Sequence, residues 1–144
     1  MNIIYNITIW LYVIGIRLSA LFNTKARLWI NGRKDIFREI EKSVKGKKNI
    51  VWFHCASLGE FEQGKPIIEA YRLKHPNQRI LLTFFSSSGF EIKKYTSLAD
   101  WVFYLPADTQ SNARRFISIV KPIKILFIKY EFWFNYMHEI KKQK

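Results

Sequence analysis

The chain has 144 residues, of which 49% are hydrophobic and 24% charged, so it is long enough to bury a core and is not a disordered tail. Lysine and arginine number 24 against 11 aspartate and glutamate, and the formal net charge is +13. This balance predicts an anionic partner such as nucleic acid, phosphate groups or a membrane surface. The single cysteine, Cys55, excludes an internal disulfide and a four-cysteine zinc site.

Residues 1–23 are predicted to form a membrane anchor or a membrane-associated helix. The stretch 3–22 is apolar apart from Asn6, Thr8, Arg17 and Ser19, and roughly 20 apolar residues span a bilayer. Such a helix either spans the membrane or lies in its surface, and an ordinary buried first helix is the alternative. Basic residues in and after the stretch would place the rest of the chain in the cytoplasm; they are Arg17, Lys25, Arg27, Arg33 and Lys34.

Residues 24–48 predict a basic amphipathic helix and a linker, because apolar residues recur at helical spacing from 25 to 44 and a polar run follows. In residues 49–144, short apolar runs predict strands at 50–56, 79–85, 101–105 and 124–130. Helical patterns fall between and after them, at 63–74, from 90 to about 95, 109–120 and 131–142. Pro66 is expected in the first turn of the first of these helices, and Asp108 or Thr109 is expected to cap the third.

This alternation predicts an α/β fold, a Rossmann-like parallel sheet with helices on both faces. Ligands of such sheets lie outside the carboxyl ends of the strands, which here are followed by residues 57–60, 86–89, 106–108 and 129–131. No dinucleotide fingerprint, P-loop or metal-ligand spacing occurs in the sequence. His54 and Cys55 are neighbours in a predicted strand and face opposite ways, which favours core positions over a shared metal.

The segment Ser57-Leu58-Gly59-Glu60 lies where the first strand gives way to a helix. Gly59 permits a close backbone approach or an unusual φ. Glu60 would lie near a helix N-terminus, where the helix dipole favours a carboxylate, and such a carboxylate can take a proton from an alcohol. A helix-capping glutamate is the alternative interpretation.

Four segments, in the same order, resemble the bacterial 3-deoxy-D-manno-octulosonic acid (Kdo) transferases of lipid A biosynthesis. His54 to Glu60 resembles the family's H-x-x-S-x-G-E, and Thr83 to Gly89 resembles its Thr/Ser-rich turn. Leu105 to Asp108 is similar to L-P-x-D, although a capping role is the preferred interpretation of the aspartate. Lys129 to Asn135 resembles E-x-E-x-W-P-N, with Lys129 and Phe134 in place of the first glutamate and the proline.

The resemblance implies a GT-B glycosyltransferase with two Rossmann-like lobes. Residues 49–144 would be the N-terminal lobe, which takes a lipid A precursor (lipid IVA), whereas a C-terminal lobe would bind the donor CMP-Kdo. The chain alone would then be inactive. The resemblance further implies no metal and no cofactor besides the donor substrate, and a place on the cytoplasmic side of the inner membrane.

The resemblance also implies roles for particular residues. Glu60 matches the catalytic general base of an inverting transfer. The matched substrate-binding residues are Ser57, Gly59, Ser86, Ser87, Ser88, Gly89, Lys129 and Glu131. Basic residues near the anchor would meet lipid phosphates, whereas no motif supports nucleic acid. A non-catalytic, membrane-bound lipid-binding module and a Rossmann-like scaffold remain the alternatives.

Overall fold

The structure is a computed structural model that describes residues 3–129 and 132–142, and a parallel β-sheet lies at its centre. The four strands are β1 (Ile50–Cys55), β2 (Arg79–Phe84), β3 (Trp101–Tyr104) and β4 (Lys124–Phe127). They lie in the order β3-β2-β1-β4, so the chain moves outward from β1 to β3 and then returns to the other side of β1. This arrangement confirms the predicted Rossmann-like sheet.

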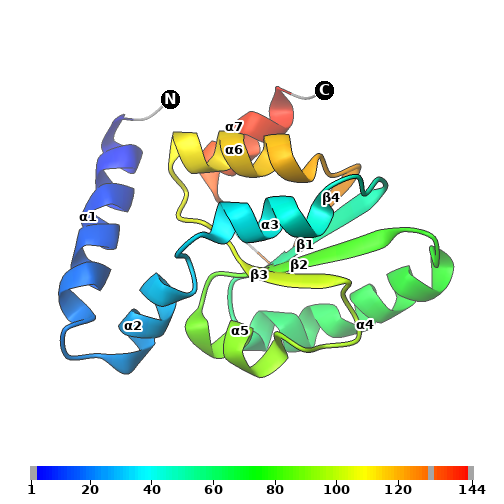
Figure 1. The fold of residues 1–144 in the computed structure, drawn as a ribbon, viewed down its shortest axis with the longest axis horizontal. Helices are drawn as coiled ribbons and strands as arrows, with labels where there is room; N and C mark the ends of the chain where they lie inside the picture. The colour runs from blue at the N-terminus through cyan, green and yellow to red at the C-terminus, as the bar shows by residue number, and fades with distance from the viewer. Residues whose placement is uncertain (1–2, 130–131, 143–144) are drawn as a thin grey trace.

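Helices cover both faces of the sheet (Figure 1). One face is covered by α3 (Ile36–Val44), α6 (Gln110–Val120) and α7 (Phe134–Lys141), and the other by α4 (Leu58–Lys74) and α5 (Ser87–Lys93). Successive side chains of β1 alternate between the two cores, with Trp52 in the first and Val51 and Phe53 in the second. All six β1 residues are buried, as expected for a strand covered on both faces.

The prediction of one continuous helix between residues 25 and 44 is wrong. Two helices form there, α2 (Thr24–Asn31) and α3. The break begins at Gly32, where an added Cβ would lie only 2.1 Å from the Tyr104 ring. It ends at Asp35, whose φ of 55° is left-handed. The close approach to Tyr104 is a tertiary contact, so helical periodicity did not reveal it.

Other predicted boundaries also move. α4 begins at Leu58 rather than residue 63, because the Ser57 side chain caps it there, and Pro66 therefore lies inside the helix instead of in its first turn. β4 ends at Phe127 rather than residue 130, and α7 begins at Phe134 rather than residue 131. Between β4 and α7, Lys129 has a left-handed φ of 66°, which ends the extended conformation.

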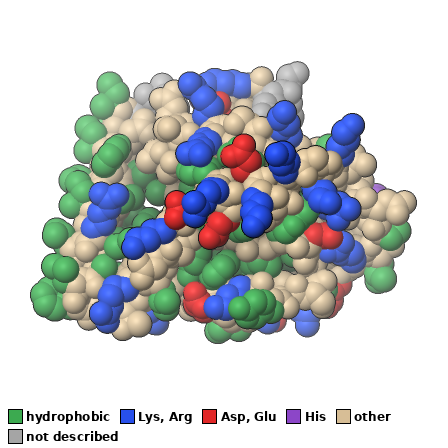
Figure 2. All heavy atoms as spheres, viewed as in Figure 1, with side chains coloured by type: hydrophobic (Ala, Val, Ile, Leu, Met, Phe, Trp, Pro, Cys, Tyr) green, Lys and Arg blue, Asp and Glu red, His purple; other side chains and the backbone are tan. Residues whose placement is uncertain are grey.

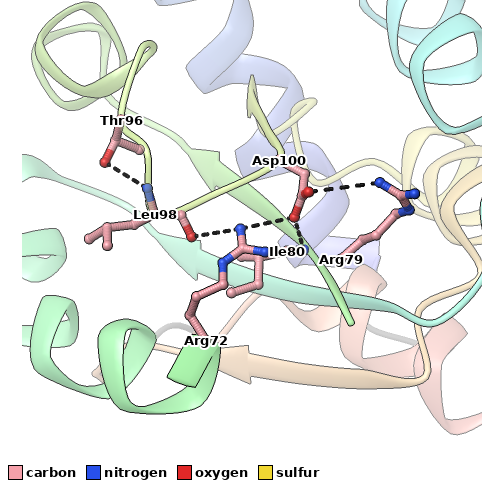
Figure 3. Close-up of polar contacts among 6 residues, drawn as sticks. All are labelled: Arg72, Arg79, Ile80, Thr96, Leu98 and Asp100. Carbon is pink, nitrogen blue, oxygen red and sulfur yellow. Dashed lines mark hydrogen bonds and ion pairs between the residues drawn. The ribbon is translucent and has the colours of Figure 1, made fainter. Parts of the chain in front are cut away.

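Polar contacts close the amino-terminal edge of the sheet (Figure 3). The Asp100 carboxylate, just before β3, accepts hydrogen bonds from the Ile80 N–H at 2.7 Å and from Arg72 at 2.9 Å. Arg79 lies 3.9 Å from the second carboxylate oxygen, and Arg72 also donates to the Leu98 carbonyl at 3.2 Å. Side chains of the protein thus occupy this edge, whereas ligands are expected at the opposite one.

α1 (Ile3–Ser19) lies beside the sheet at one end of the molecule, next to α2 (Figure 1), and none of its residues is buried. Within the described ranges, we find no helix whose length and apolar content would let it cross a membrane. The division of the chain at residues 23/24 and 48/49 stays a prediction.

A polar pair lies inside the first core. His54 and Thr83 are partners across β1 and β2, and both are fully buried. His54 Nδ1 lies 2.8 Å from Thr83 Oγ1, which also accepts a 2.8 Å hydrogen bond from Trp52 Nε1. Burial lowers the pKa of His54 to about 3, so the ring is neutral near pH 7. The predicted core positions of His54 and Cys55 are confirmed.

The buried imidazole predicts a loss of stability in acid. Below about pH 6.5 the histidine of the unfolded chain binds a proton, whereas His54 in the native state stays neutral down to about pH 3. As the pH falls through this window, the free energy of unfolding decreases by about 1.4 kcal/mol per pH unit through this group. In urea unfolding measured across the window, His54→Gln is expected to lose stability less steeply than wild type.

His75→Gln, at the partly exposed end of α4, is the matched control for removing a histidine. Parallel stability profiles for His54→Gln and wild type would contradict the prediction.

Candidate functional site

The candidate site lies at the carboxyl-terminal edge of the sheet, between β1 and β4, where the order of the strands reverses. At such a switch point a crevice forms, because the connections from the two neighbouring strands run to opposite faces. The segment after β1 leads into α4, and the segment after β4 contains Lys129. The Ile128 N–H donates to the His54 carbonyl at 2.9 Å, so the two segments leave the sheet side by side.

Glu60 lies in the first turn of α4, three residues after the N-cap Ser57. Its carboxylate oxygen Oε2 accepts a 2.5 Å hydrogen bond from the Ala56 N–H, and its own N–H donates to Ser57 Oγ at 3.4 Å. This pattern is a capping box shifted by one residue, and it holds the half-buried carboxylate at the end of β1. The capping role is therefore present, and it uses only part of the acceptor capacity of a carboxylate, which has about four lone-pair positions.

Residues 86–89, predicted as a turn, lead into α5 and form its first residues. Ser86 caps this helix by accepting a 3.2 Å hydrogen bond from the Gly89 N–H, and Ser86 Oγ lies 3.4 Å from Ser88 Oγ. Ser87 is buried, whereas Ser88 is exposed. The Ser86 N–H also donates to the Ala56 carbonyl at 2.8 Å, which places this segment directly beside the start of α4.

Two glycines of the candidate site have opposite surroundings. A Cβ at Gly89 would lie 2.6 Å from the Phe84 ring and 3.1 Å from the Leu58 nitrogen, so glycine lets α5 pack against the start of α4. Nothing lies within 4 Å of a Cβ at Gly59, and its φ is not positive. The expectation of an unusual φ at Gly59 is wrong, whereas close approach of a ligand to its backbone stays a prediction, since the space beside it is open.

Lys129 is exposed at the same edge, beyond β4, and Glu131 lies outside the described residues. The structure thus brings Ser57, Gly59 and Glu60 together with the 86–89 segment. No group of three or more His, Cys, Asp or Glu among residues 3–129 and 132–142 is placed to hold a metal ion.

Asp108 is buried, and its capping role differs from the predicted one. Thr109 caps α6, whereas Asp108 accepts hydrogen bonds of 3.1 Å from the Asn135 and Tyr136 N–H groups and so caps α7 across the fold. It also accepts a 2.5 Å hydrogen bond from the Tyr5 hydroxyl of α1. Burial raises the pKa of the Asp108 carboxyl. The Asp108 carboxylate is therefore occupied by hydrogen bonds that stabilise the fold.

The contacts of Arg33 are the main feature of this region that the sequence did not predict. The sequence showed Arg33 only as one of several basic residues that follow the apolar stretch. Its guanidinium donates to the carbonyls of Trp29, Phe85 and Leu105 at 2.9–3.0 Å. Phe85 and Leu105 directly follow β2 and β3, so Arg33 connects the N-terminal helices to the carboxyl-terminal edge of the sheet. Nothing in the charge pattern distinguished this arginine, because spacing does not reveal which basic side chain becomes partly buried.

Comparison with known proteins identifies the family of this chain. The family model described as 3-deoxy-D-manno-octulosonic-acid transferase (kdotransferase) matches residues 25–144. The 3-deoxy-D-manno-octulosonic acid transferase of Aquifex aeolicus is 35% identical over 94 residues, which are 65% of this chain and 26% of that protein. Its counterpart from Chlamydia muridarum is 29% identical over 116 residues, which are 79% of this chain and 27% of that protein.

The Haemophilus influenzae 3-deoxy-D-manno-octulosonic acid transferase is 33% identical over 92 residues, which are 62% of this chain and 21% of that protein. The chain thus spans about a quarter of the length of the curated relatives it matches.

The two glycines predict opposite effects of the same substitution. Gly89→Ala is expected to lower the free energy of unfolding by about 1–3 kcal/mol, because the new methyl group overlaps the Phe84 ring. Gly59→Ala is expected to raise it by up to about 1 kcal/mol, because alanine favours a helix and meets no atom there. Urea denaturation measures both values. A clear destabilisation by Gly59→Ala would contradict the open surroundings of that position.

Proposed function

The chain belongs to the 3-deoxy-D-manno-octulosonic-acid (Kdo) transferase family, and we propose that it is the acceptor-binding lobe of a Kdo glycosyltransferase in lipopolysaccharide biosynthesis. The observation that carries the proposal is the meeting of Ser57–Glu60, beside the switch point, with Ser86–Gly89 at the carboxyl-terminal edge of the sheet. In this proposal the acceptor is the lipid A precursor lipid IVA. A second lobe facing this edge holds the donor CMP-Kdo.

Glu60 acts in this proposal as the general base. Its carboxylate takes the proton of an acceptor sugar hydroxyl while the hydroxyl oxygen forms a bond to the anomeric carbon of Kdo. The bond from that carbon to the phosphate oxygen of CMP breaks, the electron pair leaves with CMP, and the configuration inverts. The Ala56 N–H supports this role, because its 2.5 Å hydrogen bond to Oε2 fixes the carboxylate at the edge of the sheet.

The neighbouring residues would shape and fill the acceptor site. Gly59 leaves open space beside Glu60. The exposed Ser88 offers a hydroxyl from the first turn of the neighbouring helix α5. Ser57, Ser86 and Gly89 act by holding these two segments, whereas the buried Ser87 would contribute mainly to packing. Lys129 adds a positive charge at the end of β4 that suits a phosphorylated acceptor. A Lys129→Glu variant that bound acceptor more tightly would contradict that role.

Glu60→Gln separates the two roles of the carboxylate, because the amide oxygen still accepts the Ala56 N–H but the amide is not a base. In a protein that joins this chain to the CMP-Kdo-binding part of a relative, Kdo transfer to lipid IVA is expected to fall roughly 10²-fold or more. Glu62→Gln is the control, since Glu62 is an exposed residue of the same helix and its carboxylate is paired with Lys93 at 2.7 Å.

Unchanged transfer by Glu60→Gln would contradict the assignment of the base. Binding of lipid IVA without any transfer by the unsubstituted protein would instead favour a non-catalytic lipid-binding lobe.

α1 supports a second part of the proposal, attachment to the cytoplasmic surface of the inner membrane. Its partly buried positions face the protein; they are Tyr5, Asn6, Ile9, Val13 and Ile16. Most of its exposed positions are also apolar, and the large apolar side chains among them are Ile3, Ile4, Ile7, Trp10, Leu11, Tyr12, Ile14 and Leu18. A helix that contacts the protein on one side and exposes an apolar row on the other suits an interfacial position, with basic residues meeting anionic lipid.

Ile7→Glu combined with Leu11→Glu is expected to release the protein from vesicles that contain anionic phospholipid, because both side chains lie in the exposed row of α1. Leu73→Glu is the matched control, since Leu73 is an exposed leucine on α4, away from α1. Cosedimentation with the vesicles measures the effect. Equal release by the control, or retention of the α1 variant, would contradict the interfacial position.

A further inference from the structure

A basic pocket lies between α1, the turn from α2 to α3, and the start of α6. Its volume is about 610 Å³. The wall carries one acidic side chain, Asp35, and five basic ones, which are Arg17, Arg33, Lys34, Arg38 and Arg115. Asp35 is already paired with Arg38 at 3.4 Å. Figure 2 shows lysine and arginine side chains gathered on the face that α3 and α6 form. The pocket therefore has an excess of positive charge.

Arg33 is the residue of the pocket wall that most clearly favours a bound anion. A guanidinium has five N–H donors, and carbonyl oxygens accept from Nε, Nη1 and Nη2 of Arg33 once each, which leaves two donors. Within the described part of the chain, no carboxylate lies within ion-pair distance of it. Burial lowers its pKa to about 9, because the cation loses water without gaining a counter-ion. An anion in the pocket would supply one.

Trp29 provides a second, independent sign of a missing partner. Its side chain lines the same pocket, and its ring centroid lies 3.8 Å from the Arg33 guanidinium carbon. The indole Nε1 is buried and has no hydrogen-bond partner. A buried N–H without an acceptor costs free energy, so this position favours a ligand or ordered solvent that accepts hydrogen bonds.

We propose that this pocket binds a phosphate group, with Arg33, Lys34 and Arg115 as its cationic partners. Guanidinium groups match phosphate oxygens in charge and geometry, and the charge excess of the wall suits a monoester better than a carboxylate. Val13, Ile30 and Phe37 form an apolar part of the wall, which adjoins the apolar helix α1. This continuity points to a phosphate carried by a lipid, and the inference rests on the proposed function only in that choice of source.

The indole N–H signal of Trp29 in a ¹H–¹⁵N spectrum, identified by Trp29→Phe, reports on the pocket directly. Titration of the full chain with inorganic phosphate is expected to move this signal in a saturable way. Lys34→Gln combined with Arg115→Gln is expected to weaken that binding about tenfold or more, because two charge-assisted contacts are lost. Both residues are exposed, and an unchanged circular dichroism spectrum checks the fold.

Lys74→Gln combined with Arg114→Gln is the matched control. It removes the same charge from exposed positions, one of them adjacent to Arg115, and neither residue lines this pocket. Unchanged phosphate binding by the control supports the proposal. An absent or unsaturable shift, or equal weakening by both pairs, would overturn it, because the positive surface would then act only as diffuse charge.

Vesicles of phosphatidylcholine with phosphatidic acid, which carries a phosphate monoester, distinguish the two sources. If lipid phosphate enters the pocket, the Lys34/Arg115 variant cosediments less than the control pair, and inorganic phosphate competes in the wild type. Equal cosedimentation of the two pairs would overturn the lipid source. Neither assay measures Kdo transfer, so failure here is distinguishable from failure of the proposed function.

Discussion

The position of the N-terminal helices depends on one partly buried cation, Arg33. Removing the Arg33 guanidinium from water costs free energy, and hydrogen bonds to three carbonyl groups offset this cost. The carbonyl groups come from separate places, namely Trp29 in α2, Phe85 after β2 and Leu105 after β3. The rings of Trp29, Phe85 and Tyr104 surround its charge. Without this contact, the basic pocket would lose one wall, and the loops after β2 and β3 would lose the donor that fixes their carbonyls.

Asp108 makes the corresponding connection with negative charge. It caps α7 through two N–H groups and accepts the Tyr5 hydroxyl, so α1, α7 and the loop after β3 are fixed by a single carboxylate. The Asn135 side chain adds a 3.0 Å hydrogen bond to Asn6 of α1. The helix that is proposed to lie on the membrane is therefore joined, through the start of α7, to the same edge of the sheet that carries Glu60.

The sheet and its order of elements followed from the sequence, because buried strands such as 50–55 are short apolar runs and the helices between them are amphipathic. The position of Glu60 near the start of a helix was also predictable, because a serine followed three residues later by a glutamate, just after a strand, indicates a helix start. Contacts across the fold were not predictable. The break at Gly32 depends on the Tyr104 ring, and the role of Asp108 depends on a helix that begins 26 residues further on.

Most motif residues at the candidate site have a structural reason to be there, so their presence alone does not argue for chemistry. Ser57, Ser86 and Gly89 cap or pack the helix starts, and Glu60 also satisfies a backbone N–H. Gly59 is different, because it weakens a helix by up to about 1 kcal/mol relative to alanine and relieves no contact. Departures from the best sequence for folding concentrate at functional sites. Gly59 therefore argues for a ligand at this edge of the sheet more strongly than the capping residues do.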